Sequence, residues 1–160
     1  PRTAVLSALV LASGAFGLAH AGNPNVTALA VVNVTLAGLL LGLPFVLTGR
    51  LGFSVGLHFA WNVTQSLLDM PVSGQRVGVA LGERSGATDA WRTGGAFGPE
   101  AGALGLCAIV LGTCLGAAWA RVSSGRLRLA PGLGIPPVRA VTPPASEVAP
   151  RSDEPRSDVR

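Results

Sequence analysis

The sequence predicts an all-α fold, a polytopic bundle of transmembrane helices followed by a tail that cannot build a core. The first observation is composition, because the 160 residues are 49% hydrophobic and only 12% charged, with a mean hydropathy of +0.51. Water-soluble domains carry about twice that charged fraction. The second observation is that residues 3–49, 51–68 and 101–120 contain no charged side chain. Such runs are typical of helices that cross a hydrocarbon core of roughly 30 Å.

These runs predict about four helical spans. The first run is long enough for two crossings, and turn-forming residues divide it at 21–25, where Pro24 also removes a backbone donor. We therefore expect spans at residues 3–19, 28–48, 51–68 and 101–120, with a loop at 69–100. Helices are the expected form because lipid requires each segment to satisfy its own backbone groups, and the alternating polarity of barrel strands is absent.

The basic residues indicate an orientation. All 12 are Arg, and several flank the predicted spans on one side: Arg2, Arg50, Arg121, Arg126 and Arg128. The loop at 69–100 balances its Arg residues with acidic ones. The positive-inside rule therefore predicts a multi-pass protein of the cell membrane with a cytoplasmic C-terminal tail. Scattered Arg residues without interleaved aromatic residues favour lipid head groups as the partner and exclude nucleic acid.

The composition changes after Arg121. The membrane region is predicted to cover residues 1–121, whereas residues 122–160 are rich in Pro and Arg, lack apolar periodicity and are predicted to be disordered. Within the last span, Cys107 and Cys114 are too far apart on a helix for a disulfide, and we interpret them as buried free thiols. Pro99 and Glu100 are interpreted as the first turn of that span, a structural role.

Glycines at four-residue spacing recur along the predicted spans. Such pairs of small residues let two helices approach closely, so they predict tight packing within the bundle. The pairs are Gly38 with Gly42, Gly52 with Gly56, and Gly112 with Gly116.

A few strongly polar residues lie within the spans or at their ends, where they are costly and usually face a cavity or a partner. They are His20, Asn33, His58, Asn62 and Gln65. His58 and Asn62 share a helix face because they are four residues apart. A neutral imidazole can take a proton from water or hold a metal, and an amide can donate to a developing oxyanion, so the set suits hydrolysis. A single His at a span end is more often a packing residue, and Asn33 is predicted to make an interhelical hydrogen bond.

Two motifs on these spans carry a resemblance to a known family. Residues 16–20 (FGLAH) resemble the FxxxH motif, and residues 58–62 (HFAWN) the HxxxN motif, of the CPBP (Abi, CAAX prenyl protease-like) intramembrane endopeptidases. The motifs occur in the family's order and at similar spacing. The resemblance extends over roughly residues 4–100, because residues 94–100 are similar to the segment that leads into the family's last helix.

The resemblance implies an enzyme that hydrolyses peptide bonds of membrane-associated or prenylated substrates with water activated by Glu and His. It implies that His20 activates the water, that His58 and Asn62 form the oxyanion site, and that Phe16 packs beside them. No cofactor is expected, since two His and one Asn leave a zinc site short of ligands, but a divalent metal such as zinc is left open as the alternative. The implied partners are a peptide or protein substrate in or at the membrane and the lipid bilayer.

The sequence departs from the family at the paired-glutamate motif, EExxxR, which precedes FxxxH in the family. The only adjacent acidic pair is Asp153 with Glu154, in the tail. We therefore expect the chain to be the C-terminal part of a longer endopeptidase, inactive by itself without the upstream glutamates. The alternative is a non-catalytic membrane protein of the same fold, with a binding, immunity or scaffold role.

Depth in the membrane poses a second difficulty. His20 lies near the end of the first span, whereas His58 lies early in the third, which separates them by roughly 15 Å in ideal vertical helices. The two can meet if the first span begins deeper or tilts, or if residues 51–55 are an irregular entry to the third span.

Overall fold

Helices make up the regular structure of the chain. The computed structural model describes residues 2–82, 89–125 and 128–133. In order, the elements are α1 (Arg2–Ala19), α2 (Ala28–Thr48), α3 (Gly52–Leu67), α4 (Ala90–Thr93), the 3₁₀ turn η1 (Pro99–Ala101) and α5 (Ala103–Ser124). The described residues contain no strand beyond one isolated bridge between Val72 and Gln75. The predicted all-α fold is confirmed.

Three of the helices, α1, α2 and α5, are long and apolar enough to cross a membrane. The predicted third span is a helix of 16 residues, which is about 24 Å long and is not among the three. Its membrane crossing stays a prediction. The last helix begins at Ala103 rather than at residue 101, because Pro99–Ala101 forms a separate turn and Gly102 is extended (φ −119°, ψ 166°).

The helix ends follow local chemistry. Residues 20–27 interrupt the first charge-free run as predicted, and the Thr27 hydroxyl caps α2 by accepting from the Ala30 N–H at 3.0 Å. Gly49 ends α2 in the left-handed region at φ 72°, which glycine adopts without strain. α3 is regular from Gly52 onward, with the Val55 N–H bonded to the Leu51 carbonyl, so the irregular entry at 51–55 is wrong. The relative placement and tilt of the helices must therefore make up for the difference in depth between His20 and His58.

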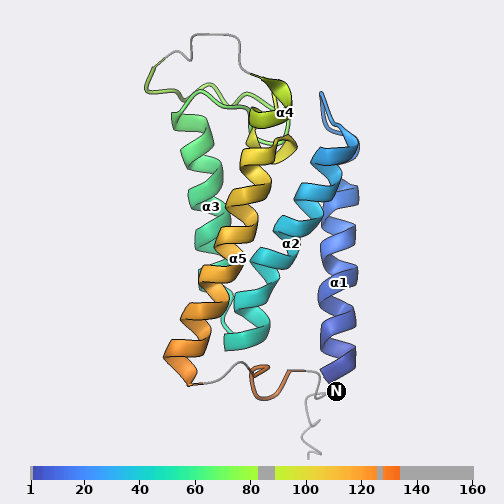
Figure 1. Cartoon of the computed structure of the whole chain (residues 1–160), viewed down its shortest axis with the longest axis vertical. Helices are drawn as coiled ribbons and strands as arrows, with labels where there is room; N and C mark the ends of the chain where they lie inside the picture. Colours follow the sequence, from blue (N-terminus) through green and yellow to red (C-terminus); the bar gives the residue numbers. More distant parts are fainter. Residues whose placement is uncertain (1, 83–88, 126–127, 134–160) are drawn as a thin grey trace, which may run out of the picture.

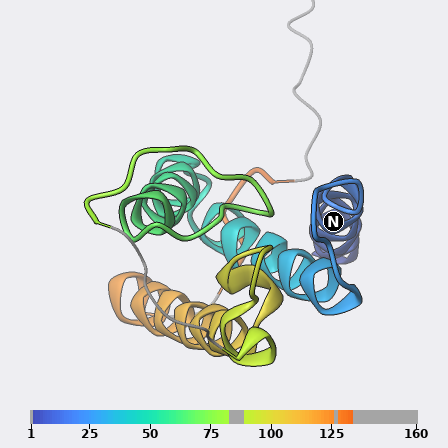
Figure 2. The same cartoon turned by 90° about the horizontal axis from the view of Figure 1, so that it is seen from above.

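α2 is the central helix and packs against α1, α3 and α5 (Figure 2). α1 approaches it closely, because a Cβ at Gly17 would collide with Thr35, and one at Gly38 would lie 2.9 Å from the Ser13 Cα. The predicted tight packing is thus confirmed at Gly38. It is wrong for Gly52 and Gly56, because a Cβ added at either position would meet no atom of the described residues within 4 Å.

The segment after α3 folds over one end of the bundle (Figure 1). Phe97 is 1% exposed and packs in a small core with Ala30, Val34 and Ala101. The Gly74 N–H donates to the Phe97 carbonyl at 2.7 Å, which holds residues 72–75 against this core. This segment was predicted only as a loop, yet it contains α4 and η1 and positions two side chains of the site.

The C-terminal part corrects two predictions. α5 continues to Ser124, and the Ala130 N–H then donates to the Val46 carbonyl at 2.8 Å, so residues 128–133 pack on the end of α2 instead of being disordered. The predicted disorder of residues 134–160 lies outside the described residues. Cys107 and Cys114 are free as predicted but exposed rather than buried, because they lie on the outer side of α5.

The two ends of the bundle differ in charge. The start of α1, the end of α2 and the end of α5 lie together at one end, and residues 69–82 and 89–101 lie at the other (Figure 1). The described Arg residues that were predicted to share one side therefore do so: Arg2, Arg50, Arg121 and Arg128. Which end is cytoplasmic stays a prediction.

Candidate active site

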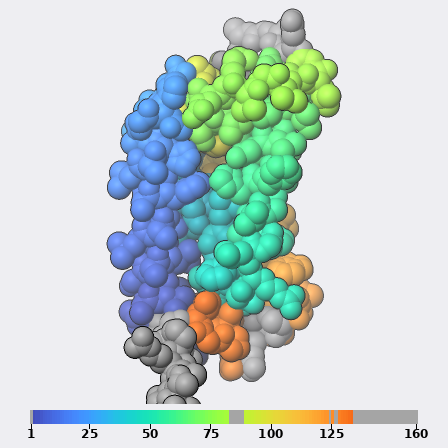
Figure 3. All heavy atoms as spheres, turned by 180° about the vertical axis from the view of Figure 1, so that it is seen from behind, coloured from blue at the N-terminus to red at the C-terminus, as the bar shows by residue number. Residues whose placement is uncertain are grey.

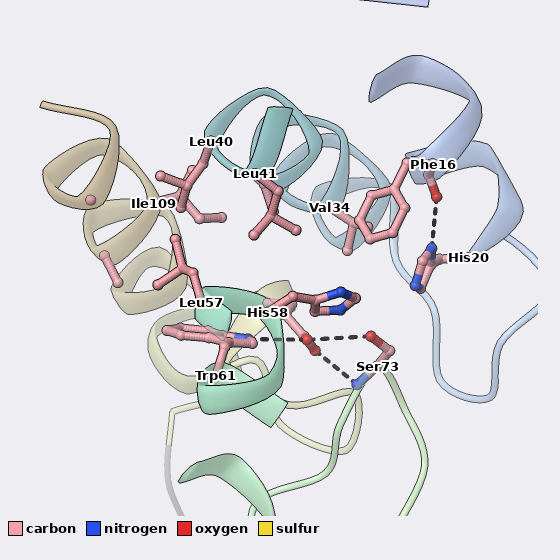
Figure 4. Close-up of a pocket in the computed structure, with 14 residues that line it drawn as sticks. Phe16, His20, Val34, Leu40, Leu41, Leu57, His58, Trp61, Ser73 and Ile109 are labelled. Carbon is pink, nitrogen blue, oxygen red and sulfur yellow. Dashed lines mark hydrogen bonds between the residues drawn. The ribbon is translucent and has the colours of Figure 1, made fainter. Parts of the chain in front are cut away.

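A cavity of about 220 Å³ lies among the helices, and it brings together residues far apart in the sequence. α1, α2, α3 and α5 all contribute to its wall, along with the loop and η1. Its apolar side is formed by Leu40, Leu41, Leu57 and Ile109, among others, whereas its polar side carries His20, His58, Ser73 and Glu100 (Figure 4). Seen from behind the view of Figure 1, the surface is hollowed between α1 and α3, and α2 forms the floor of this hollow (Figure 3).

His20 directly follows α1 and is oriented by that helix's last turn. Its main-chain N–H donates to the Gly17 carbonyl at 3.1 Å. Its ring nitrogen Nδ1 lies 2.7 Å from the Phe16 carbonyl oxygen (Figure 4). Because a carbonyl oxygen only accepts, this hydrogen bond requires the proton on Nδ1. In the neutral imidazole, Nε2 is then the nitrogen with the lone pair, through which His20 can accept a proton.

Phe16 joins the two imidazoles. Its ring centroid is 4.7 Å from that of His20 and 5.9 Å from that of His58, with edge-to-face geometry in both contacts. The rings of α1 and α3 therefore meet at Phe16, despite the depth difference that the sequence suggested. The structure places the predicted FxxxH pair and His58 in one site.

Asn62 is not part of the cavity wall. The wall takes Leu57, His58 and Trp61 from α3, whereas Asn62 lies about 40° beyond His58 on the side away from Trp61, at about 100° per residue. The main-chain carbonyl of Asn62 accepts from the Ser66 hydroxyl at 2.9 Å. The oxyanion role of Asn62 remains a prediction from the resemblance.

Glu100 is the site residue whose place the sequence interpretation missed. It belongs to η1, not to the first turn of α5, and its side chain is buried at 6% exposure. Its carboxylate accepts from the Trp61 indole N–H at 3.3 Å and from the Ser73 main-chain N–H at 2.8 Å (Figure 4). A usable signal was present, since an acidic residue beside a span of so uncharged a chain is a candidate functional residue.

The other polar residues of the spans have structural partners. Asn33 is fully buried, and its amide donates to the Gly102 carbonyl at 3.1 Å, which confirms the predicted interhelical bond. The Gln65 amide donates to the Pro71 carbonyl at 3.3 Å and fastens the loop. Gln65 also lines a larger, more open hollow of about 450 Å³ on α3, whose wall contains no His, Cys or charged residue. The side chains that can exchange protons therefore line the smaller cavity, not the larger hollow.

The site can exchange protons but shows no metal cage. Across residues 2–82, 89–125 and 128–133, no group of three or more His, Cys, Asp or Glu side chains is arranged to hold a metal ion. Two imidazoles and a carboxylate on an apolar wall can still accept or donate protons to a bound molecule. The fold and this cavity define a helical membrane protein with a histidine-lined interhelical site.

The comparison with protein families agrees with the motifs. Residues 2–64 match the family model described as type II CAAX prenyl endopeptidase Rce1-like, and this stretch includes both FxxxH and HxxxN. The predicted resemblance is thereby confirmed over somewhat less than half of the chain. Ser73 and Glu100 lie outside the matched residues. The searches of curated proteins and of solved structures gave no match.

Proposed function

We propose that this chain is part of an intramembrane endopeptidase that hydrolyses peptide bonds of membrane-associated or prenylated substrates. The observation that carries the proposal is the meeting of His20 and His58 at Phe16, on one apolar cavity, within the segment that matches an endopeptidase family. The hollow between α1 and α3 opens on the side of the bundle, which suits a substrate that approaches from the lipid (Figure 3).

The chemistry follows from the orientation of His20. With its proton on Nδ1, the Nε2 of His20 takes a proton from water, whose oxygen attacks the peptide carbonyl while the proton passes on to the leaving amine. His58 donates to the developing oxyanion from the opposite helix. The resemblance assigns the second proton acceptor to paired glutamates, which precede FxxxH in that family. No cofactor takes part in this scheme.

The alternative is a membrane protein that binds a partner through the same cavity without hydrolysis. The observation that favours it is the absence of EExxxR from the 160 residues. Both proposals place the protein in a membrane with the bilayer and a peptide or protein as partners. Hydrolysis by the full-length protein separates them.

The test measures cleavage of a fluorogenic membrane peptide by the full-length protein in liposomes. We expect His20→Ala and His58→Ala to lower kcat/KM by about 10²–10⁴-fold, because each removes a proton-transfer or oxyanion group. Leu18→Ala is the matched control, since Leu18 neighbours His20 but is 69% exposed and should leave the rate unchanged. Activity near wild type in both His variants would contradict the proposal and indicate that the two imidazoles have only packing roles.

Asn62 is tested in the same assay. The role that the resemblance assigns to it predicts a loss of roughly 10²–10³-fold in Asn62→Ala, as is typical for one oxyanion donor. An unchanged rate would agree instead with its position off the cavity wall.

A further inference from the structure

The carboxylate of Glu100 is the acidic group of the cavity, and the proposed reaction does not use it. Its Oε1 accepts from the Trp61 indole N–H and the Ser73 hydroxyl, each at 3.3 Å, and its Oε2 accepts from the Ser73 main-chain N–H at 2.8 Å. A carboxylate offers about four acceptor positions, two on each oxygen. One position, on Oε2, is therefore unfilled.

The negative charge of Glu100 also has no cationic partner in the described part of the chain. The ion pairs there join Arg76 to Asp69 and Arg92 to Asp89. Buried charges are normally paired, because removing them from water is costly, and the three donors offset only part of that cost. Apolar walls also strengthen the attraction to any cation that enters. The cavity is thus suited to a positive charge at this end.

The apolar wall of the cavity determines which kind of side chain fits. Beyond the polar side, its wall is formed by hydrocarbon side chains such as Leu40, Leu41 and Leu57 (Figure 4). Its volume of about 220 Å³ is below the range of pockets for drug-sized ligands, so it accommodates one side chain rather than a length of peptide. Lys and Arg side chains combine an apolar stem with a cationic head, which matches both parts of the wall.

We propose that Glu100 makes this cavity a specificity pocket for a basic side chain of a membrane-associated peptide. The stem packs against the leucines, and the ammonium or guanidinium group donates to the unfilled position on Oε2. Glu100 lies in η1, three residues before the start of α5, at the end of the bundle, where the basic residues that flank a membrane segment extend toward water. That the ligand is a peptide rests on the proposed function. The preference for a cation does not.

The test compares n-pentylammonium with n-pentanol as probes of the full-length protein in detergent micelles. Trp61 fluorescence, in a Trp91→Phe, Trp119→Phe background, reports occupancy because Trp61 lines the cavity. We expect the amine to bind at least about 10-fold more tightly than the alcohol. Glu100→Gln should weaken amine binding by about 10–100-fold, the usual contribution of a charged hydrogen bond.

Two control variants separate charge from shape. Asp89→Asn removes an exposed carboxylate that is not part of the cavity, and should leave both affinities unchanged. Gly112→Leu places a side chain in the cavity beside Leu40, and should weaken binding of amine and alcohol alike. Equal affinity of wild type for the two probes, or unchanged amine affinity in Glu100→Gln, would overturn the proposal. If circular dichroism shows that Glu100→Gln does not fold, the wild-type comparison decides.

Different outcomes would contradict the proposed function and the specificity pocket. Selective amine binding by a protein that cleaves no peptide would keep the specificity pocket and count against the endopeptidase. Cleavage without any preference for Lys or Arg near the cleaved bond, together with equal binding of the two probes, would keep the endopeptidase and remove the pocket.

Discussion

At the scale of single residues, the FxxxH spacing has a physical reason in this structure. The His20 N–H bonds the Gly17 carbonyl in a tight turn, which leaves the Phe16 carbonyl without its helical partner. Such carbonyls at a helix end need another donor, and the His20 imidazole, four residues on, supplies it. The same spacing places the Phe16 ring against the imidazole. One helix end thus fixes both the tautomer and the position of His20.

Asn33 provides a stability prediction at this scale. Its amide donates to the Gly102 carbonyl from a fully buried position, so Asn33→Ala removes the hydrogen bond that joins α2 to the start of α5 and leaves that carbonyl with the Leu106 N–H as its donor. We expect a loss of about 0.5–1.5 kcal/mol in the free energy of unfolding, the usual net contribution of one hydrogen bond, measured by SDS titration of the protein in mixed micelles. The neighbouring Val32→Ala, at a residue 54% exposed, is the control and should cost little. Equal effects of the two substitutions would show that the hydrogen bond contributes nothing.

At the scale of elements, the contact between α1 and α2 depends on glycine at particular positions. A Cβ added at Gly17 would meet Thr35 and the Val31 carbonyl, whereas one added at Gly14, about one turn earlier on the same helix, would have no neighbour within 4 Å. Ser13 and Gly17, four residues apart, lie on the strip of α1 that meets α2, and Gly14 lies about 60° to 100° around the helix from them. Because Phe16 precedes Gly17 on α1 and His20 directly follows that helix, the close approach also sets their distance from α2 and the cavity.

The two glycines make a matched pair of substitutions. Gly17→Ala should destabilise the protein by about 1–3 kcal/mol, because the methyl group must push Thr35 and the two helices apart. Gly14→Ala should be neutral or stabilising by up to about 1 kcal/mol, because alanine is the better helix former and meets no neighbour. Unfolding titrations of both variants measure the difference. Similar stabilities would contradict the close packing of α1 on α2.

At the scale of the whole molecule, the sequence predicts the helices well and the site only in part. Charge-free runs and turn residues locate α1, α2, α3 and α5, because crossing lipid imposes a strong and local constraint on composition. The motifs likewise identify His20 and His58. The positions of Ser73 and Glu100 are not local, since they depend on Phe97 entering the core beside α2. That contact is visible in the folded structure of the loop but not in its sequence.

The same loop depends on backbone that a hydropathy pattern does not reveal. Gly98 has a φ of 107°, and a Cβ there would collide with the Pro71 carbonyl, so glycine is required where the chain turns into η1. This turn brings Glu100 to Trp61 and Ser73 rather than into the first turn of α5. The error in the sequence interpretation therefore lies in one tight turn of three residues, at the point where the loop meets the last helix.

Orientation in the membrane gives the last prediction. The start of α1 and the ends of α2 and α5 share one end of the bundle, and that end carries Arg2, Arg50, Arg121 and Arg128 without any acidic residue among the described ones (Figure 1). Because positive charge is retained on the cytoplasmic side, this end should be cytoplasmic, and residues 69–82 should be outside.

Single cysteines introduced into a Cys107→Ala, Cys114→Ala background check this orientation in intact cells. Both native thiols must be removed because they are exposed. Val77→Cys, at a residue 60% exposed in the loop, should react with a membrane-impermeant maleimide, whereas Leu51→Cys, also 60% exposed but between α2 and α3, should react only after the membrane is permeabilised. The two positions are matched in exposure, so a difference in labelling reports the side of the membrane. Labelling of Leu51→Cys alone in intact cells would reverse the orientation, and would place the loop, Ser73 and Glu100 at the cytoplasmic end.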